Sequence, residues 1–228
     1  LDATDAWFLY STSQEAAGLP ADVLQAAAEL AQADAAKDGV AVAADSIKLT
    51  LKMPCYLPVM QFAHSSDLRQ QLYRAYATRA SDLGQKPEWD NSAVMDEILA
   101  LRAEEAQLLG YANFAQLSLV PKMADTPEQV IAFLRDLAAR ARPYAQQDVA
   151  DLRRFAAAEL GMAEPQAWDW TYISEKLKEA RYAFSEQEVR QYFPAPRVLA
   201  GLFGIVQKLF GVEITADSAP VWHEAVAF

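Results

Sequence analysis

Hydrophobic and polar residues follow a helical period along most of this chain. Apolar side chains recur every three or four positions in the segments 20–39, 66–84, 91–110, 126–161 and 195–211. This spacing is typical of amphipathic helices that bury one face. The pattern therefore predicts a mostly helical protein.

One segment has the period of a strand. In SIKLTLKMP, the apolar residues Ile47, Leu49, Leu51 and Met53 alternate with polar ones. This alternation predicts a half-buried strand over residues 46–53 that ends at Pro54. A strand cannot stand alone, because its backbone polar groups need partners. The closing residues VWHEAVAF predict a weaker strand over 221–228, with Trp222, Val226 and Phe228 on one side.

The clearest helix start lies at TPEQ. Thr126 can cap the helix, Pro127 occupies its first position, and Gln129 can complete a capping box. Pro143 falls inside the same pattern and is expected to kink or split the helix near Arg142. Four further boundaries are expected: starts at Ser66 and at Ser185 with Glu188, and stops at Gly39 and Gly110.

Together these elements predict a mainly α fold, an orthogonal array of helices with a minor β element. The sequence shows no internal repeat, low-complexity tract or flexible linker. A chain of 228 residues can bury a real core, and we expect residues 1–228 to form one helical domain or lobe.

The amino-acid composition limits the classes of function that this chain can have. Hydrophobic residues make up 53% and charged residues 22%, as in a globular protein, and the net charge is -11. Basic residues are scattered, which argues against nucleic acid, and no apolar run is long enough to span a membrane. The single Cys55 cannot form an internal disulfide, so a cytoplasmic location is expected.

Few residues suggest catalytic chemistry. His223 and Glu224 begin a zinc-peptidase H-E-x-x-H motif, but Ala227 stands where the second histidine belongs. The only other histidine is His64, whereas a catalytic zinc needs about three protein ligands. We therefore expect no metal site and no catalytic residue in this chain. A Cys55-dependent enzyme is a weaker hypothesis, because an unactivated cysteine usually behaves as a small apolar residue.

An aromatic segment, PQAWDWTYISEKL, has two interpretations. Trp168, Trp170 and Tyr172 alternate around Asp169. They could line a groove that holds an extended peptide by stacking and hydrogen bonds. They could also fix one end of a helix in the core, which is the interpretation that we favour. If the groove exists, these three residues are its candidate lining.

Several stretches together resemble the thimet oligopeptidase family of zinc peptidases, in particular its bacterial oligopeptidase and dipeptidyl carboxypeptidase branches. They occur in the family's order and cover essentially the whole chain: YLPVMQFA, LRQQLYRAYATRASD, WDNSAVMDEILALRAEEAQLLGYANFAQLSLVPKMA, WDWTYISEKLKEARYAFSEQEVRQYFP, LAGLFGIVQKLFGVEI and VWHEAVAF. The resemblance implies two helical lobes around a deep channel, in which one zinc ion serves the hydrolysis of short peptides.

The family's metal-binding motif and its transition-state tyrosines lie further toward the C-terminus than any residue here. The resemblance therefore implies an internal, non-catalytic piece that needs no cofactor itself, while zinc belongs to the full-length parent. Its expected partners are short peptides, through the full-length enzyme, and the remainder of the parent chain. A stand-alone helical module that binds peptides or a protein is the alternative. Whether the parent is an endopeptidase or removes C-terminal dipeptides stays open.

Overall fold

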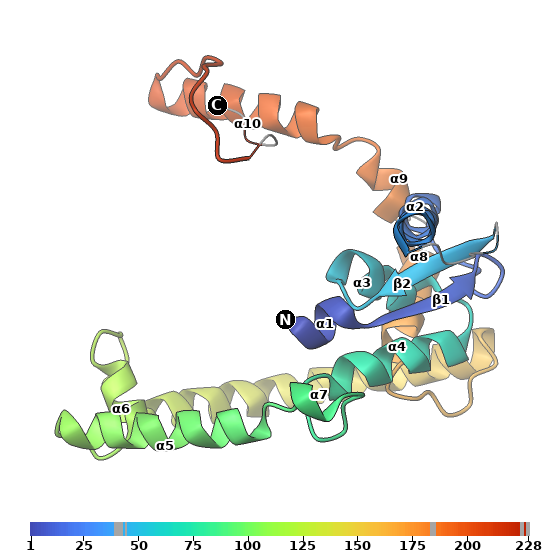
Figure 1. The fold of residues 1–228 in the computed structure, drawn as a ribbon. Helices are drawn as coiled ribbons and strands as arrows, with labels where there is room; N and C mark the ends of the chain where they lie inside the picture. Colours follow the sequence, from blue (N-terminus) through green and yellow to red (C-terminus); the bar gives the residue numbers. More distant parts are fainter. Residues whose placement is uncertain (39–42, 44, 183–185, 224–225, 227–228) are drawn as a thin grey trace. The chain divides into compact units, whose positions relative to one another are not determined.

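The computed structural model describes residues 1–38, 43, 45–182, 186–223 and 226. Its elements are α1 (Asp2–Ala6), β1 (Phe8–Thr12), α2 (Ala21–Asp38), β2 (Ser46–Thr50), α3 (Met53–Phe62), α4 (Ser66–Thr78), a 3-10 turn (Pro87–Trp89), α5 (Ser92–Leu108), α6 (Phe114–Leu119), α7 (Pro127–Glu159), α8 (Trp170–Tyr182), α9 (Glu186–Arg190) and α10 (Ala195–Phe210) (Figure 1). The predicted mainly α fold with a minor β element is confirmed.

Contacts within the chain define two compact units, Leu1–Arg181 and Tyr182–Phe228, and each is described on its own. The first contains the sheet and helices α1 to α8, and the second contains α9 and α10. The expectation of one lobe over residues 1–228 stays a prediction.

The predicted strand has an antiparallel partner near the N-terminus. β1 pairs with β2 so that Leu9 lies opposite Leu49 and Ser11 lies opposite Ile47. β2 is shorter than expected, because it ends at Thr50 and α3 begins at Met53. Proline is tolerated in the first turn of a helix, where its missing N–H has no partner to lose. Pro54 therefore starts a helix, whereas the sequence pattern had made it the end of a strand.

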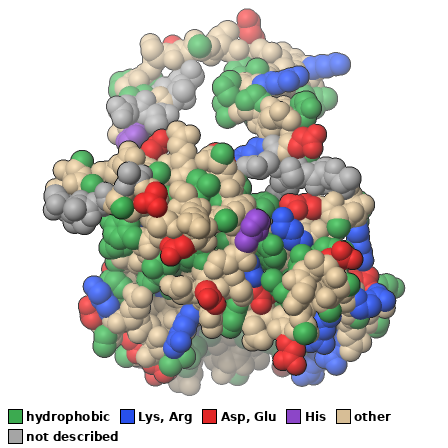
Figure 2. Space-filling model, turned by 90° about the vertical axis from the view of Figure 1, so that its right-hand side faces the viewer, with side chains coloured by type: hydrophobic (Ala, Val, Ile, Leu, Met, Phe, Trp, Pro, Cys, Tyr) green, Lys and Arg blue, Asp and Glu red, His purple; other side chains and the backbone are tan. Residues whose placement is uncertain are grey.

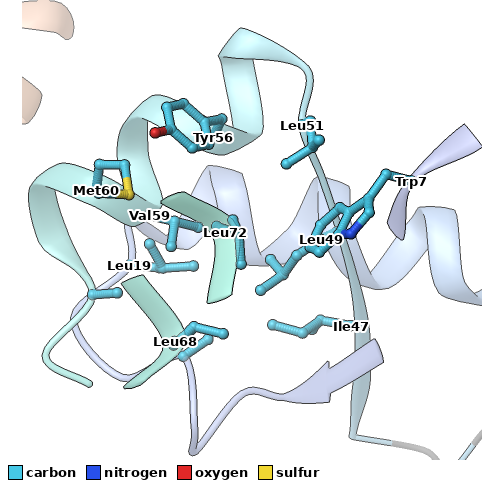
Figure 3. Close-up of a cluster of buried hydrophobic side chains, with 13 residues drawn as sticks. Trp7, Leu19, Ile47, Leu49, Leu51, Tyr56, Val59, Met60, Leu68 and Leu72 are labelled. Carbon is cyan, nitrogen blue, oxygen red and sulfur yellow. The ribbon is translucent and has the colours of Figure 1, made fainter. Parts of the chain in front are cut away.

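The hydrophobic core lies between this sheet and helices α2, α3 and α4. Its largest fully buried apolar side chains are Ile47, Leu49, Leu51, Leu72 and Val59. Figure 3 shows Ile47 and Leu49 pointing from β2 toward Leu68 and Leu72 of α4. The period-two pattern thus identified the buried face correctly as far as Leu51, whereas Met53 lies in α3 and is 50% exposed.

Most predicted helix boundaries agree with the structure. Thr126 Oγ1 accepts a hydrogen bond from the Gln129 backbone N–H at 3.1 Å, as a cap should. α7 continues through Pro143 without splitting. The predicted start of α4 was wrong by one residue. The capping side chain is that of Ser65, whose Oγ accepts a hydrogen bond from the Leu68 backbone N–H at 3.2 Å. Gly110 follows α5 with φ +81°, a conformation that suits glycine.

The predicted strand at the C-terminus has no support among the described residues. α10 ends at Phe210, and neither Val221–His223 nor Val226 belongs to a strand. The expected boundaries at Gly39 and Ser185 lie outside the described residues, as do Glu224 and Phe228. Within the described ranges, no helix is long and apolar enough to cross a membrane.

Gly18 allows the turn after β1 to approach the end of α3. It has φ +99°, and a Cβ at this position would lie 2.2 Å from the Phe62 carbonyl oxygen. The His64 N–H donates to the Ala17 carbonyl at 2.9 Å, which holds the two segments together. Only glycine satisfies both the backbone angle and the close approach.

Gly18→Ala is therefore expected to lower the free energy of unfolding by about 3–5 kcal/mol, since backbone strain and a steric clash add. Gly161→Ala is the matched control, because Gly161 has φ +67° but no atom within 4 Å of an added Cβ. This control substitution should lower the free energy of unfolding by only about 1–2 kcal/mol. Denaturant titration measures both, and equal losses would contradict this account of Gly18.

Candidate functional site

The predicted aromatic segment lies at the start of α8, and two of its three rings face the interior. Trp168 is half-buried, packs against the core and donates from Nε1 to Ser66 Oγ at 3.0 Å. Tyr172 is 8% exposed. Trp170 is half-buried, and its ring lies 5.8 Å from the Arg153 guanidinium. The segment thus contributes to the fold, and its role as a channel lining stays a prediction.

A buried ion pair holds this segment against α4. Arg69, which is fully buried, donates from Nη2 to Asp169 Oδ1 at 2.6 Å. Asp169 Oδ1 also accepts from Ser66 Oγ at 2.9 Å, and Oδ2 accepts from the Gln166 N–H at 3.0 Å. These contacts satisfy the carboxylate on both oxygens, as a buried charge requires. They connect residues about a hundred positions apart in the sequence.

The Nη1 atom and the guanidinium face of Arg69 also have partners. Its Nη1 donates to the carbonyl oxygens of Ala63 and His64, which lie at the turn between α3 and α4. Its guanidinium carbon lies 4.3 Å from the centre of the Tyr172 ring, a cation–π contact. The buried Nε has no hydrogen-bond partner, and the guanidinium carbon bonded to it faces that ring. Arg69 therefore connects the turn between α3 and α4 with the start of α8.

Asp169→Asn should lower the free energy of unfolding by about 3–5 kcal/mol, because it leaves the Arg69 guanidinium buried and uncompensated. Asp136→Asn is the control, since Asp136 pairs with Arg140 at 2.9 Å on an exposed part of α7. That substitution should change stability by about 1 kcal/mol or less. Denaturant titration of both variants tests the difference, and a similar small loss in each would show that the buried pair contributes little.

A small apolar pocket opens between α2 and the start of α3. It has a volume of about 210 Å³ and is lined by Val23, Ala27 and Leu30 of α2, among others, and by Cys55. Burial raises the pKa of the Cys55 thiol, although the Thr50 N–H donates to Sγ at 3.3 Å and partly opposes the shift. A nucleophilic thiol needs a lowered pKa. This geometry argues against the Cys55-dependent enzyme.

Alkylation of Cys55 near neutral pH should accordingly be slower than that of an unfolded chain by about tenfold or more. Because the pKa is raised, the pH midpoint of the rate should lie above that of a free cysteine. Cys55 is the only cysteine, so the labelling rate reports on it without interference. The same chain in denaturant is the control. Equal rates in the two states, or a lowered midpoint, would contradict the assignment.

Histidine, cysteine and acidic side chains are the possible zinc donors of this chain. Among the residues that the structure describes, no three histidine, cysteine or acidic side chains come together as metal ligands do. His64 and His223 belong to different units, and the His64 ring lies 6.4 Å from the Tyr172 ring, centre to centre. No step of a zinc reaction can therefore be assigned to these side chains.

Charged side chains of both signs are interspersed on the face shown in Figure 2. Ion pairs among the described residues include Lys176 with Glu179 at 2.9 Å, where both side chains are half-buried, and Arg181 with Asp151 at 3.0 Å. Hydrogen bonds from Arg181, Gln147 and Arg154 hold the pKa of Asp151 below its usual value. These contacts pair opposite charges within and between the helices α7 and α8. The expectation that nucleic acid is not a partner stays a prediction.

Comparison with known proteins gives one consistent result. Residues 59–228 match the model of peptidase family M3. Oligopeptidase A of Escherichia coli and that of Salmonella typhimurium are each 47% identical to this chain over 231 residues, which is all of this chain and 33% of theirs. A dipeptidyl carboxypeptidase of Salmonella typhimurium is 29% identical over 171 residues.

The chain thus spans about a third of the length of the oligopeptidases A that it matches. The family match covers the helices from α4 to α10, including the aromatic segment and Asp169. Arg69 lies within the matched range as well. The chain belongs to peptidase family M3.

Proposed function

We propose that this chain forms part of the non-catalytic channel wall of a cytoplasmic, zinc-dependent oligopeptidase that hydrolyses short peptides. The observation that carries this proposal is the match to oligopeptidase A over the whole chain but over only a third of the relative. The resemblance implies that zinc is held by residues beyond this segment. The bound metal would activate water and polarise the peptide carbonyl there.

The physical role of such a wall is to limit access. A rigid helical wall excludes folded proteins and admits short peptides by shape, so it needs no catalytic side chains. The buried Arg69–Asp169 pair supports this role, because it fixes α8 to the core around α4. Of the three predicted lining residues, Trp168 and Tyr172 are engaged in the core, which leaves Trp170 as the one best placed to touch a peptide.

A stand-alone helical binding module remains a second candidate. The apolar pocket beside Cys55 favours it, because a cavity of about 210 Å³ can hold a small apolar group. The two proposals differ in what the isolated chain does. A module binds peptides or a protein partner by itself, whereas a channel wall requires the rest of the polypeptide.

A chimera tests the channel-wall proposal. These 228 residues would replace the matching 231-residue segment of Escherichia coli oligopeptidase A. The chimera is expected to bind zinc and to cleave short peptides with a kcat/KM within about tenfold of the parent, a difference of about 1.4 kcal/mol. Chelation should abolish turnover. A version without the segment is the control and should be inactive.

A chimera that folds and binds zinc, yet cleaves no peptide, would contradict the proposal. Calorimetric titration of the isolated chain with short peptides separates the two candidates further. Binding by the isolated chain, together with an inactive chimera, would favour the module.

A further inference from the structure

A groove lies between α4 and the N-terminal segment of the first unit. It has a volume of about 410 Å³, and its walls come from α4, from β1 and from residues 83–85. A narrow extension of about 20 Å³ adjoins it and is lined also by α1 and the 3-10 turn. The two spaces share four lining residues, which are Trp7, Ala75, Thr78 and Gln85. Together they are called the α4 groove below.

Three cationic side chains line the α4 groove, whereas no acidic side chain of the described residues does. Arg74 lines the wider part, and Arg79 and Lys86 line the extension. None of the three forms an ion pair with a described residue. Asp82 and Glu88, on the same segment as Lys86, are exposed and line neither space. In a chain with a net charge of -11, this groove is a local site for negatively charged ligands.

Arg79 is held in place by contacts that lead back to the core. Its guanidinium carbon lies 3.6 Å from the centre of the Tyr76 ring, and its Nη1 donates to the Tyr76 carbonyl at 2.6 Å. The Tyr76 ring stacks on that of the core residue Tyr56, with 4.2 Å between the ring centres. The other N–H groups of Arg79 have no hydrogen-bond partner among the described residues. The side chain can therefore bind a carboxylate with little further loss of entropy.

The uncharged part of the lining fits the remainder of a peptide. Trp7 lies where the groove meets its extension, and the exposed side chains of Phe8 and Leu83 line the wider part. Trp89 lines the extension, where Lys86 Nζ lies 4.4 Å from the centre of its ring. Two glutamine amides in the wider part can donate to and accept from a peptide backbone. The groove thus offers contacts for carboxylates, for apolar side chains and for amide groups.

The distribution of the cations favours separate carboxylates over a phosphate group. Arg74 lines only the wider part, whereas Arg79 and Lys86 line only the extension, so the positive charge is spread along the groove. A phosphate concentrates its charge at one point and is commonly bound by backbone N–H groups at a helix N-terminus. Here α4 presents its C-terminal end, where Arg79 is the cap residue. An extended ligand with several carboxylates matches this arrangement.

We propose that the α4 groove binds short acidic peptides, with their carboxylates at Arg74, Arg79 and Lys86 and an apolar side chain against Trp7. The inference uses only the lining of the groove and does not depend on the proposed channel-wall function. It adds a binding site and a preference for negatively charged peptides.

Titration of the 228-residue chain with two tripeptides tests this site. Glutamyl-glutamyl-phenylalanine carries two side-chain carboxylates, whereas glutaminyl-glutaminyl-phenylalanine has nearly the same size and no charged side chain. At low salt, calorimetry should give a dissociation constant of about 1 mM or lower for the acidic tripeptide. The neutral tripeptide should bind about tenfold more weakly. Higher ionic strength should weaken the binding of the acidic tripeptide, because salt screens exposed charges.

Two matched double variants locate the binding. Arg74→Gln with Lys86→Gln removes two charges from the groove, and Arg135→Gln with Arg142→Gln removes two from exposed positions on α7. All four side chains are exposed and none forms an ion pair with a described residue, so both variants should fold, which thermal unfolding verifies. The groove variant should raise the dissociation constant of the acidic tripeptide about tenfold. The control variant should change it by about twofold or less.

Three results would overturn the proposal. The first is equal affinity for the two tripeptides. The second is an equal loss of affinity in the two double variants, which would mean that net charge alone governs binding. The third is displacement of the acidic tripeptide by inorganic phosphate at a similar concentration, which would show a general anion site.

The oligopeptidase A chimera adds a fourth test, with its metal chelated so that the tripeptide is not cleaved. The groove variant should weaken binding there as it does in the isolated chain. If it has no effect in the chimera, the rest of the polypeptide fills the groove and the proposal is wrong. An unsubstituted chimera without peptidase activity would contradict the proposed function alone, because the titrations do not use cleavage.

Discussion

The first unit depends on the burial of one arginine. Arg69 lies at the base of α4 with no exposed surface, and Asp169 compensates its charge from a segment about a hundred residues later. Ser66, two carbonyl oxygens and the face of the Tyr172 ring surround the pair and satisfy most of its polar groups, although the Arg69 Nε has no hydrogen-bond partner. The ion pair thereby joins α4 to the start of α8, so that the residues between these two helices form one large loop of the chain.

This constraint explains the aromatic segment. Trp168 donates to Ser66, which itself donates to Asp169, and the Tyr172 ring packs against the Arg69 guanidinium, so both aromatic residues border the buried charge. The helices inside the loop, α5 to α7, carry large apolar side chains that are exposed in the first unit, such as Leu99 and Phe133.

The sequence alone was enough to predict the structural features that depend on residues close together in the chain. Thr126 and Gly110 identified helix ends because capping is a local interaction. The alternation of Ile47, Leu49 and Leu51 identified β2 and its buried face. The sequence pattern did not predict β1, because its exposed and buried positions do not alternate regularly. It did not predict α3 either, because the proline at the second position of this helix resembles the end of a strand. The Arg69–Asp169 contact could not be predicted, since nothing local joins residues so far apart.

We propose that this chain supplies structure to a zinc peptidase and holds no catalytic metal itself. The most direct measurement is the zinc content of the purified 228-residue chain, combined with an assay on short peptides in the presence and absence of a chelator. The account predicts no stoichiometric zinc and no turnover. One zinc ion per chain with chelator-sensitive cleavage would contradict it.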